Sequence, residues 1–331
     1  MNVDATPTLA ELPKAELHCH LEGAARPDLV RRIAGERGID LSRLFDADGR
    51  YVSGDFTTFL STYDEVDAVF SRPEDYVELA ADHFGWLAEQ GAIHGEVFAS
   101  PAHAASLGMT WPEHVEAIVQ GIERARKTHS IEARIVATGV RHFGPDSVLE
   151  AARTVADHPH PWVTGFGLAG DERQHHVRDF APAFDVAREA GLGLTAHAGE
   201  FSGAQSVVDA LDWLKVSRIG HGVRAAEDEA VMDRLAAERI VLEVCPGSNL
   251  ALGVYDSAAD HPLGKLWDAG VRVTLNSDDP PFFHTDLSAE YAFAAEEKRL
   301  EEADLREITR TAIEAAFVDE ATRERLLAKV G

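Results

Sequence analysis

The 331-residue sequence is poor in cysteine, in basic residues and in long apolar runs. With only Cys19 and Cys245 it cannot build a disulfide framework, which is typical of a protein in a reducing compartment. Lysine and arginine number 31 against 57 acidic residues, and the net charge of −26 disfavours nucleic acid and anionic membranes as partners. No apolar run reaches the length of a membrane span, and the first residues, MNVDATPTLAEL, lack the features of a secretory signal. We therefore expect a soluble, cytoplasmic protein.

No linker rich in proline, glycine or serine divides the chain, so we treat residues 1–331 as one domain. Short apolar segments alternate with helical patterns, and this alternation predicts a parallel (β/α)8 TIM barrel, although a doubly wound sheet shows it too. Residues 27–90 are too long for one βα unit, which predicts extra helices inserted after strand 1. The expected strands are residues 15–20, 93–99, 133–140, 163–168, 192–198, 218–221, 240–245 and 271–277.

Polar motifs follow five of the expected strands. In a parallel α/β protein the carboxyl ends of the strands meet at one edge, where active sites are built. We therefore expect these motifs to form one site. They are HCH at residues 18–20, GLAGDE at 167–172, HAGE at 197–200, GHG at 220–222 and NSDDPPFF at 276–283.

Three histidines and an aspartate from these motifs are suited to hold one metal ion. His18 and His20 lie two residues apart, so they share one face of a strand while Cys19 points the other way. His197 and Asp278 come from two other strand ends. A nitrogen-rich set with one carboxylate suits Zn²⁺ better than Mg²⁺ or Ca²⁺. Taken alone, the pair His18 and His20 is equally compatible with packed core residues. His197 alone is more typical of a structural residue than of a ligand, and Asp278 alone is compatible with a turn.

Three further polar residues lie close to these positions. A carboxyl group in a closed pocket, such as that of Glu200, can hold a proton and donate it. His221 has glycine on both sides and is a candidate base or orienting group for a metal-activated water. Asp279 follows Asp278 on a twisted strand end and is expected to point toward the substrate. Considered alone, Glu200 is better explained as a charge at the N-terminus of a helix, and His221 is only weak evidence for a catalytic role.

The order of six motifs is that of the adenosine/adenine deaminase family of the amidohydrolase superfamily, which this sequence resembles from about Leu12 to about Leu287. The resemblance implies a (β/α)8 barrel that binds one zinc ion and hydrolytically deaminates a 6-aminopurine. It implies His18, His20, His197 and Asp278 as the zinc ligands. The motifs are PKAELHCHLEG, GLAGDE, HAGE, RIGHGVR, EVCPGSN and VTLNSDDPPFF.

The same resemblance implies roles for individual residues. Glu200 would protonate N1 of the purine and make C6 electrophilic. His221 and Asp278 would position and deprotonate the water that attacks C6. Asp279 would hydrogen-bond N7, and the backbone N–H of Gly170 would bind N3.

The motifs disagree about which 6-aminopurine is the substrate. Members that act on adenosine usually have Asp after HxHL, whereas members that act on adenine usually have Glu, as at Glu22 here. The adenine group tends to carry a DSSE-like sequence where this chain has AGDE, and EVCPGSN also favours a nucleoside. Weighing two motifs against one, we predict deamination of adenosine and 2′-deoxyadenosine, with His20 and Glu22 beside the substrate. Adenine and aminodeoxyfutalosine are the alternatives.

An apolar stripe marks the expected helix over residues 55–70. Phe56, Phe59, Leu60 and Tyr63 recur at i, i+3, i+4 and i+7. Such a stripe packs on a barrel as a general rule, and the resemblance implies that it also forms a hydrophobic gate over the pocket.

Two other classes of protein fit part of the pattern. A two-metal amidohydrolase that cleaves an amide, ester or phosphoester often uses a bridging carbamylated lysine. Between HCH and HAGE the only lysine is Lys127, which lies away from every expected strand end. A non-enzymatic relative would have a decayed site, yet all the catalytic positions are present. The sequence does not indicate the oligomeric state.

Overall fold

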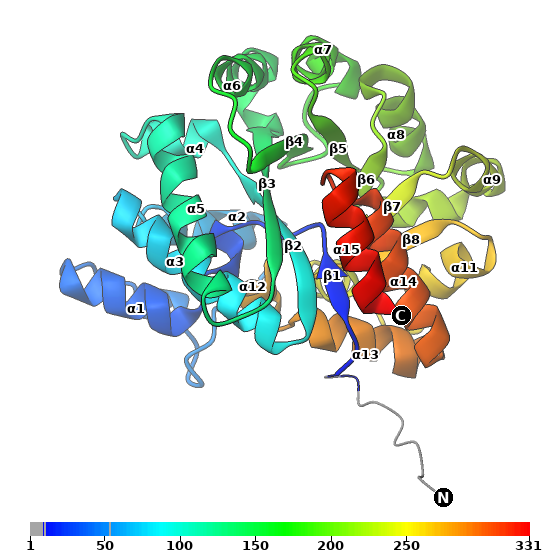
Figure 1. The fold of residues 1–331 in the computed structure, drawn as a ribbon, viewed down its shortest axis with the longest axis horizontal. Coiled ribbons are helices and arrows are strands. Elements are labelled where there is room, and N and C mark those ends of the chain that lie inside the picture. The colour runs from blue at the N-terminus through cyan, green and yellow to red at the C-terminus, as the bar shows by residue number, and fades with distance from the viewer. Residues whose placement is uncertain (1–8, 10, 53) are drawn as a thin grey trace, which may run out of the picture.

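The computed structural model describes residue 9, residues 11–52 and residues 54–331. Eight strands form one parallel sheet in the order in which they occur along the chain (Figure 1). This arrangement and the surrounding helices confirm the predicted (β/α)8 barrel. The strands are β1 (Lys14–Glu16), β2 (Ala92–Ala99), β3 (Glu132–Val140), β4 (Val163–Ala169), β5 (Gly193–Ala198), β6 (Arg218–His221), β7 (Val241–Val244) and β8 (Arg272–Leu275).

The segments that follow β1 and β8 join at the mouth of the barrel. The N–H of Asp278 donates to the carbonyl of His18 at 3.1 Å, and the N–H of His20 donates to the carbonyl of Asp278 at 3.0 Å. Backbone bonds between expected metal ligands therefore hold the two ends of the sheet together.

The first strand is shorter than the predicted range of residues 15–20. Its ladder ends at Glu16 because the next amide, that of Leu17, donates to the side-chain oxygen of Asn276 at 2.8 Å. Beyond this point the HCH motif forms only isolated bridges to neighbouring segments. The prediction of a continuous strand through His20 is therefore wrong, because a side chain takes the place of a backbone partner.

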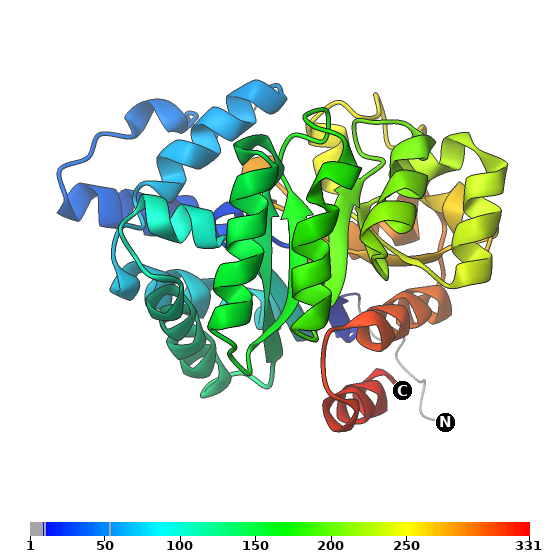
Figure 2. The same cartoon turned by 90° about the horizontal axis from the view of Figure 1, so that it is seen from above.

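Helices surround the strands, and three of them, α1 to α3, form the predicted insertion after β1. Figure 2 shows α14 and α15 on the face of the barrel opposite α2. The helices are α1 (Pro27–Glu36), α2 (Phe56–Asp67), α3 (Pro73–Glu89), α4 (Pro101–Ser106), α5 (Trp111–Arg126), α6 (Pro145–Asp157), α7 (Ala181–Glu189), α8 (Ala204–Asp209), α9 (Glu229–Glu238), α10 (Pro246–Ala251), α11 (Leu263–Asp268), α12 (Pro280–Phe283), α13 (Leu287–Glu297), α14 (Glu302–Ala315) and α15 (Glu320–Val330).

Local sequence explains where α2 begins. Asp55 is its N-cap, and the carboxylate accepts the backbone N–H of Thr58 at 2.9 Å. The helix then runs to Asp67, close to the predicted range of residues 55–70. Within the described part of the chain no helix is long and apolar enough to cross a membrane.

Candidate active site

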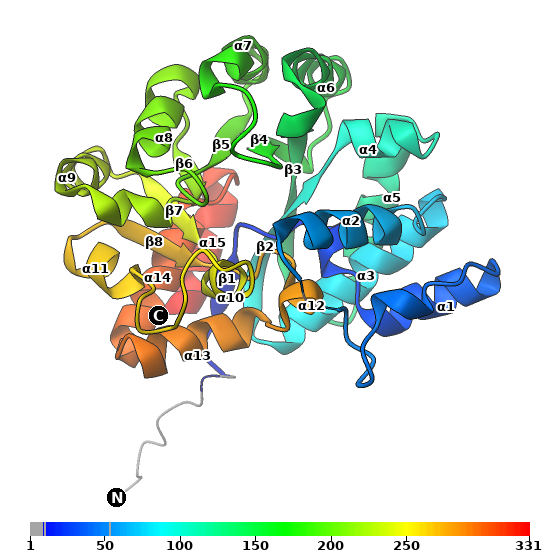
Figure 3. The same ribbon diagram turned by 180° about the vertical axis from the view of Figure 1, so that it is seen from behind.

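The five polar motifs contribute to one cavity of about 90 Å³ at the carboxyl ends of the strands. Figure 3 shows α2, α10 and α12 on this side of the barrel. Two residues of the cavity, His221 and Asp278, have positive φ angles of 58° and 63°. Side chains other than glycine rarely adopt this conformation, and such strain concentrates at functional sites. The convergence of the motifs is therefore accompanied by a strained backbone.

The four expected metal ligands lie together. One donor atom from each of His18, His20, His197 and Asp278 lies within 4.8 Å of the others. The Nε2 atoms of His18 and His197 are 3.1 Å apart, and Oδ1 of Asp278 is 3.3 Å from Nε2 of His20. That oxygen is buried and has no hydrogen-bond partner among the described residues. Three imidazoles facing an unsatisfied carboxylate oxygen fit a divalent ion such as zinc.

The far side of two of these histidines is held by acceptors. Nδ1 of His18 donates to Oε2 of Glu243 at 2.8 Å, and Nδ1 of His197 donates to the carbonyl of Leu168 at 3.0 Å. Both bonds leave Nε2 free to face the cluster, as the outer partners of metal-bound histidines do. Gly220 permits this packing, because a Cβ there would lie 2.8 Å from the His18 ring.

Glu243 itself belongs to a buried group of charges inside the barrel. Arg218 lies between two carboxylates, with Nε 2.6 Å from Glu243 and a terminal nitrogen 2.8 Å from Glu96. Burial alone would raise the pKa of Glu96, but Arg218, His94 and the backbone N–H of Phe317 together outweigh burial and hold the pKa at about 2. Sequence analysis did not single out these residues, although a Glu inside each apolar strand was a visible signal.

Glu200 lies on a loop after β5, and a second carboxylate holds that loop. Oε1 of Glu172 accepts the N–H of Gly199 at 2.7 Å. Its Oε2 accepts the N–H groups of Glu200, Phe201 and Ser202 at 2.8–3.0 Å. Glu172 therefore positions Glu200 without lining the cavity. Sequence analysis placed Glu172 in a motif but gave it no role.

Burial raises the pKa of Glu200 well above its usual range, and the charge of Asp278 raises it further. The carboxyl group therefore favours its protonated form more strongly than an exposed glutamate does. Nε2 of His221 lies 3.7 Å from Oε2 of Glu200 and 3.9 Å from Oδ2 of Asp278. These three groups surround one small volume beside the expected metal ligands.

The pKa values of the adjacent carboxyl groups of Asp278 and Asp279 are shifted in opposite directions. Burial raises the pKa of Asp279 well above its usual range, and the neighbouring Asp278 adds to the rise. Burial would also raise the pKa of Asp278, but the neighbouring imidazoles of His18, His20 and His221 together outweigh burial and hold the pKa well below its usual range. Oδ1 of Asp279 has no hydrogen-bond partner among the described residues. It occupies the space that a side chain at Gly23 would need, since a Cβ there would lie 1.6 Å away.

Glu22 lines the cavity together with the expected gate. Oε2 of Glu22 accepts the hydroxyl of Tyr63 at 3.1 Å, whereas Oε1 is buried without a partner among the described residues. Burial raises the pKa of Glu22. The predicted gate residues all come from α2 and line this cavity. They are Phe56, Phe59, Leu60 and Tyr63.

The cavity also contains two histidines that sequence analysis missed. His103 follows β2 and His142 follows β3, so both come from strand ends without a recognisable motif. Burial lowers the pKa of His103 to about 4, and its ring is therefore neutral near pH 7. Gly170 lines the same wall, with a φ of 95° that favours glycine.

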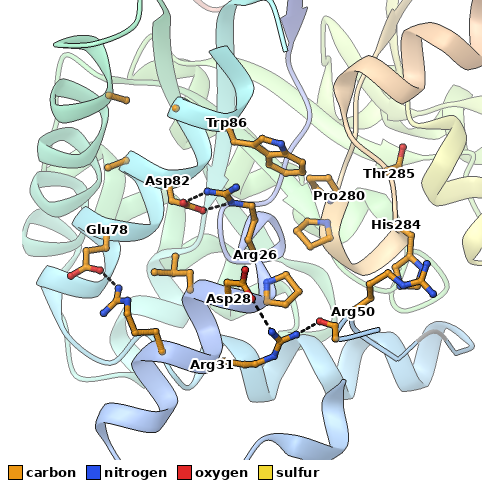
Figure 4. A pocket seen from close by; sticks show the side chains of 18 of the residues that line it. Arg26, Asp28, Arg31, Arg50, Glu78, Asp82, Trp86, Pro280, His284 and Thr285 are labelled. Atoms are coloured by element: carbon orange, nitrogen blue, oxygen red, sulfur yellow. Dashed lines mark hydrogen bonds and ion pairs between the residues drawn. The ribbon is translucent and has the colours of Figure 1, made fainter. Parts of the chain in front are cut away.

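A larger groove of about 980 Å³ lies outside the barrel, between α1, α3 and α12 (Figure 4). Two of its arginines pair with acidic residues: Nε of Arg26 donates to Asp82 at 2.7 Å and Arg31 pairs with Asp28 at 2.8 Å. The groove contains none of the predicted site residues. We therefore place the candidate chemistry in the smaller cavity.

Comparisons with known proteins agree with this geometry. Residues 13–331 match the family model described as adenosine deaminase. An adenine deaminase of Sinorhizobium medicae is 53% identical over 96% of this chain and 98% of its own. The crystal structure of an adenine deaminase from Arthrobacter aurescens has 29% identity and a TM-score of 0.88, covering 96% and 98% of the two chains. A zinc-bound amidohydrolase from Burkholderia ambifaria has 27% identity and a TM-score of 0.89, covering 99% and 93%.

The predicted substrate, adenosine, is wrong, because these relatives are named for adenine. The prediction gave AGDE and EVCPGSN more weight than Glu22. In the structure AGDE lines the cavity with Ala169 and Gly170, which offer no polar side chain to a ribose. Asn249 of EVCPGSN faces two buried histidines instead of the cavity. Of these features only Glu22 presents a polar side chain there.

The family model covers residues 13–331, which include the eight strands of the barrel and the polar motifs at their ends. The chain therefore belongs to the adenosine deaminase family and is a hydrolytic deaminase on an amidohydrolase barrel.

Proposed function

We propose that this enzyme converts adenine and water to hypoxanthine and ammonia. The observation that carries the proposal is the carboxyl group of Glu22, which lines the cavity and whose Oε1 is buried with no hydrogen-bond partner among the described residues. A free purine base has an N9–H where a nucleoside has its ribose, and this oxygen is an acceptor for that N–H. A ribose would instead compete for space with Glu22 and the Tyr63 hydroxyl that binds it. The names of the relatives support the same substrate.

We further propose one zinc ion per chain, held by His18, His20, His197 and Asp278. When bound, zinc supplies Lewis-acid activation of water near neutral pH. The unsatisfied oxygen of Asp278 and the inward-facing nitrogens support this assignment.

The chain's own residues then move the protons. Glu200 holds a proton and donates it to N1, which makes C6 electrophilic. His221 and the second oxygen of Asp278 orient the attacking water. Asp279 binds N7 and the backbone N–H of Gly170 binds N3. Asp278 accepts a proton from that water, and transfer of this proton to the exocyclic amine lets ammonia leave and gives hypoxanthine.

The apolar residues of α2 close the cavity and exclude water during the reaction. The partner implied is a small purine, with no role for nucleic acid or a membrane. We assign the whole chain, residues 1–331, to one catalytic domain. We place it in the cytoplasm, since both Cys19 and Cys245 are free.

Product analysis tests the proposal. The zinc-loaded enzyme is incubated with adenine, and hypoxanthine is measured by chromatography beside ammonia. We expect the two products in equal amounts. Absence of hypoxanthine with a fully zinc-loaded, folded protein would contradict the proposal.

A further inference from the structure

A chain of buried polar side chains leads from His221 away from the cavity. Nδ1 of His221 lies 3.3 Å from Nδ2 of Asn249, and Oδ1 of Asn249 lies 3.1 Å from Nε2 of His261. Nδ1 of His261 lies 3.3 Å from the backbone nitrogen of Leu263. All three side chains are at most 2% exposed. Asn249 is in α10, His261 stands just before α11, and neither lines the cavity.

The direction of these hydrogen bonds follows from the backbone amide at the far end. An amide N–H can only donate, so Nδ1 of His261 must accept and carries no proton. The ring is enclosed by Tyr255 and Phe293, with centroids 5.3 and 5.4 Å away. Burial lowers the pKa of His261 to about 3, and Lys298 contributes further, so the ring is neutral. Its one proton is therefore on Nε2, which donates to Asn249.

The orientation of the Asn249 amide is then determined. Its oxygen accepts from His261, so its NH2 group faces His221 and donates to Nδ1. The backbone of Asn249 is held as well, because its N–H donates to Cys245 and its carbonyl accepts from Val254. With Nδ1 accepting, a neutral His221 carries its proton on Nε2, the atom that faces Glu200 and Asp278.

We propose that Asn249 and His261 are positioning residues that hold His221 as its Nε2–H tautomer. His221 then donates a hydrogen bond to the oxygen of the attacking water instead of accepting its proton. The carboxylate of Asp278 is left as the acceptor. This refines the joint role that the family resemblance implies for His221 and Asp278. The tautomer assignment is independent of the proposed function, and only its effect on catalysis rests on that function.

Substitutions along the chain separate this role from simple packing. Asn249→Asp keeps the shape but replaces the donor that faces His221 with an acceptor, so it favours a proton on Nδ1 and a lone pair on Nε2. His261→Gln keeps an N–H donor toward Asn249, whereas His261→Leu removes it and lets the amide turn over. A packing role alone would not distinguish donors from acceptors at these positions.

NMR spectroscopy of the zinc-loaded enzyme labelled with ¹⁵N-histidine tests the proposal directly. Long-range ¹H–¹⁵N correlations show which ring nitrogen carries the proton, and His221→Gln identifies the signal of His221 by its loss. We expect Nε2–H in the wild type and in His261→Gln, and Nδ1–H in Asn249→Asp. A wild-type signal with Nδ1–H, or an unchanged tautomer in Asn249→Asp, would overturn the proposal.

Kinetics provide a second readout. A histidine held in the wrong tautomer costs about 10⁴ in kcat in a serine protease. We expect a loss of about that size for Asn249→Asp, with KM and zinc content close to those of the wild type. A full kcat in a variant whose tautomer has changed would refute the catalytic consequence. If adenine is not a substrate at all, the tautomer measurement still decides the structural part of the proposal.

Discussion

Replacing Glu172 by Gln tests whether a buried carboxylate holds the loop that carries Glu200. The carboxylate accepts four backbone N–H groups, from Gly199, Glu200, Phe201 and Ser202. The amide of Gln has one oxygen, so at least one N–H loses its acceptor and meets a second donor. Hydrogen bonds to a charged acceptor contribute about 1.5–3 kcal/mol each. The bonds that persist in Glu172→Gln have a neutral acceptor and are roughly half as strong.

The free energy of unfolding therefore falls by about 4 kcal/mol in Glu172→Gln, which lowers Tm by roughly 6 °C for a chain of this length. Because the N–H of Glu200 is one of the four donors, its carboxyl group shifts as well. We expect kcat to fall by about 10–100-fold, since small displacements of a catalytic group are costly. Thermal unfolding followed by circular dichroism and steady-state kinetics with adenine measure the two effects.

Glu150→Gln is the matched control, because Glu150 is exposed on α6. It removes the same charge without touching the loop, so Tm and kcat should stay close to the wild type. An E172Q protein with unchanged Tm would refute the anchoring role. A lowered Tm with full kcat would show that the loop is stabilised but that Glu200 is not positioned by it.

Three other substitutions test single parts of the site and of the fold. Glu200→Gln removes the proton donor but no zinc ligand. Turnover should fall by at least about 10²-fold while metal analysis still gives about one zinc per chain. Near-normal turnover would exclude Glu200 as the acid. Glu243→Gln weakens the hydrogen bond that orients His18. Zinc affinity, measured by chelator competition, should then fall about 10–100-fold. Unchanged affinity would contradict an orienting role for Glu243. Burial raises the pKa of Glu290 to about 8, although hydrogen bonds from Thr285 and Gly247 oppose the rise. The folded state therefore keeps a proton that the unfolded chain loses near its ordinary pKa of 4.5, and the stability from this group is lost as the pH rises from about 4.5 to about 8. Denaturant titrations across that range should show a smaller decline for Glu290→Gln than for the wild type, and an equal decline would refute this assignment.

The barrel was predictable because each βα unit leaves a local pattern. A buried parallel strand is a short apolar run, and an amphipathic helix repeats its apolar residues every three to four positions. The same logic located the polar motifs at the strand ends and so brought His18, His20, His197 and Asp278 together. It failed for the end of β1, where the amide of Leu17 is paired with the side chain of Asn276, a partner more than 250 residues away.

The supporting residues of the site were not predictable in the same way. Glu172, Glu243 and Asn249 act through hydrogen bonds to partners on other strands and loops, so a local signal can mark such a residue but cannot give its partner or its role. This also explains the wrong substrate. Two sequence motifs were given weight as substrate contacts although their polar side chains hold other parts of the site, whereas the single residue Glu22 lines the cavity.

The ratio of kcat/KM for adenine to that for adenosine tests the central claim most directly. It is measured by ammonia release from the zinc-loaded enzyme, with 2′-deoxyadenosine and aminodeoxyfutalosine in parallel. If, as we propose, Glu22 accepts the N9–H of the free base in the space that a ribose would need, adenine should be preferred by at least about 100-fold. A ratio near one, or a preference for any of the nucleosides, would contradict the assignment of adenine as the substrate.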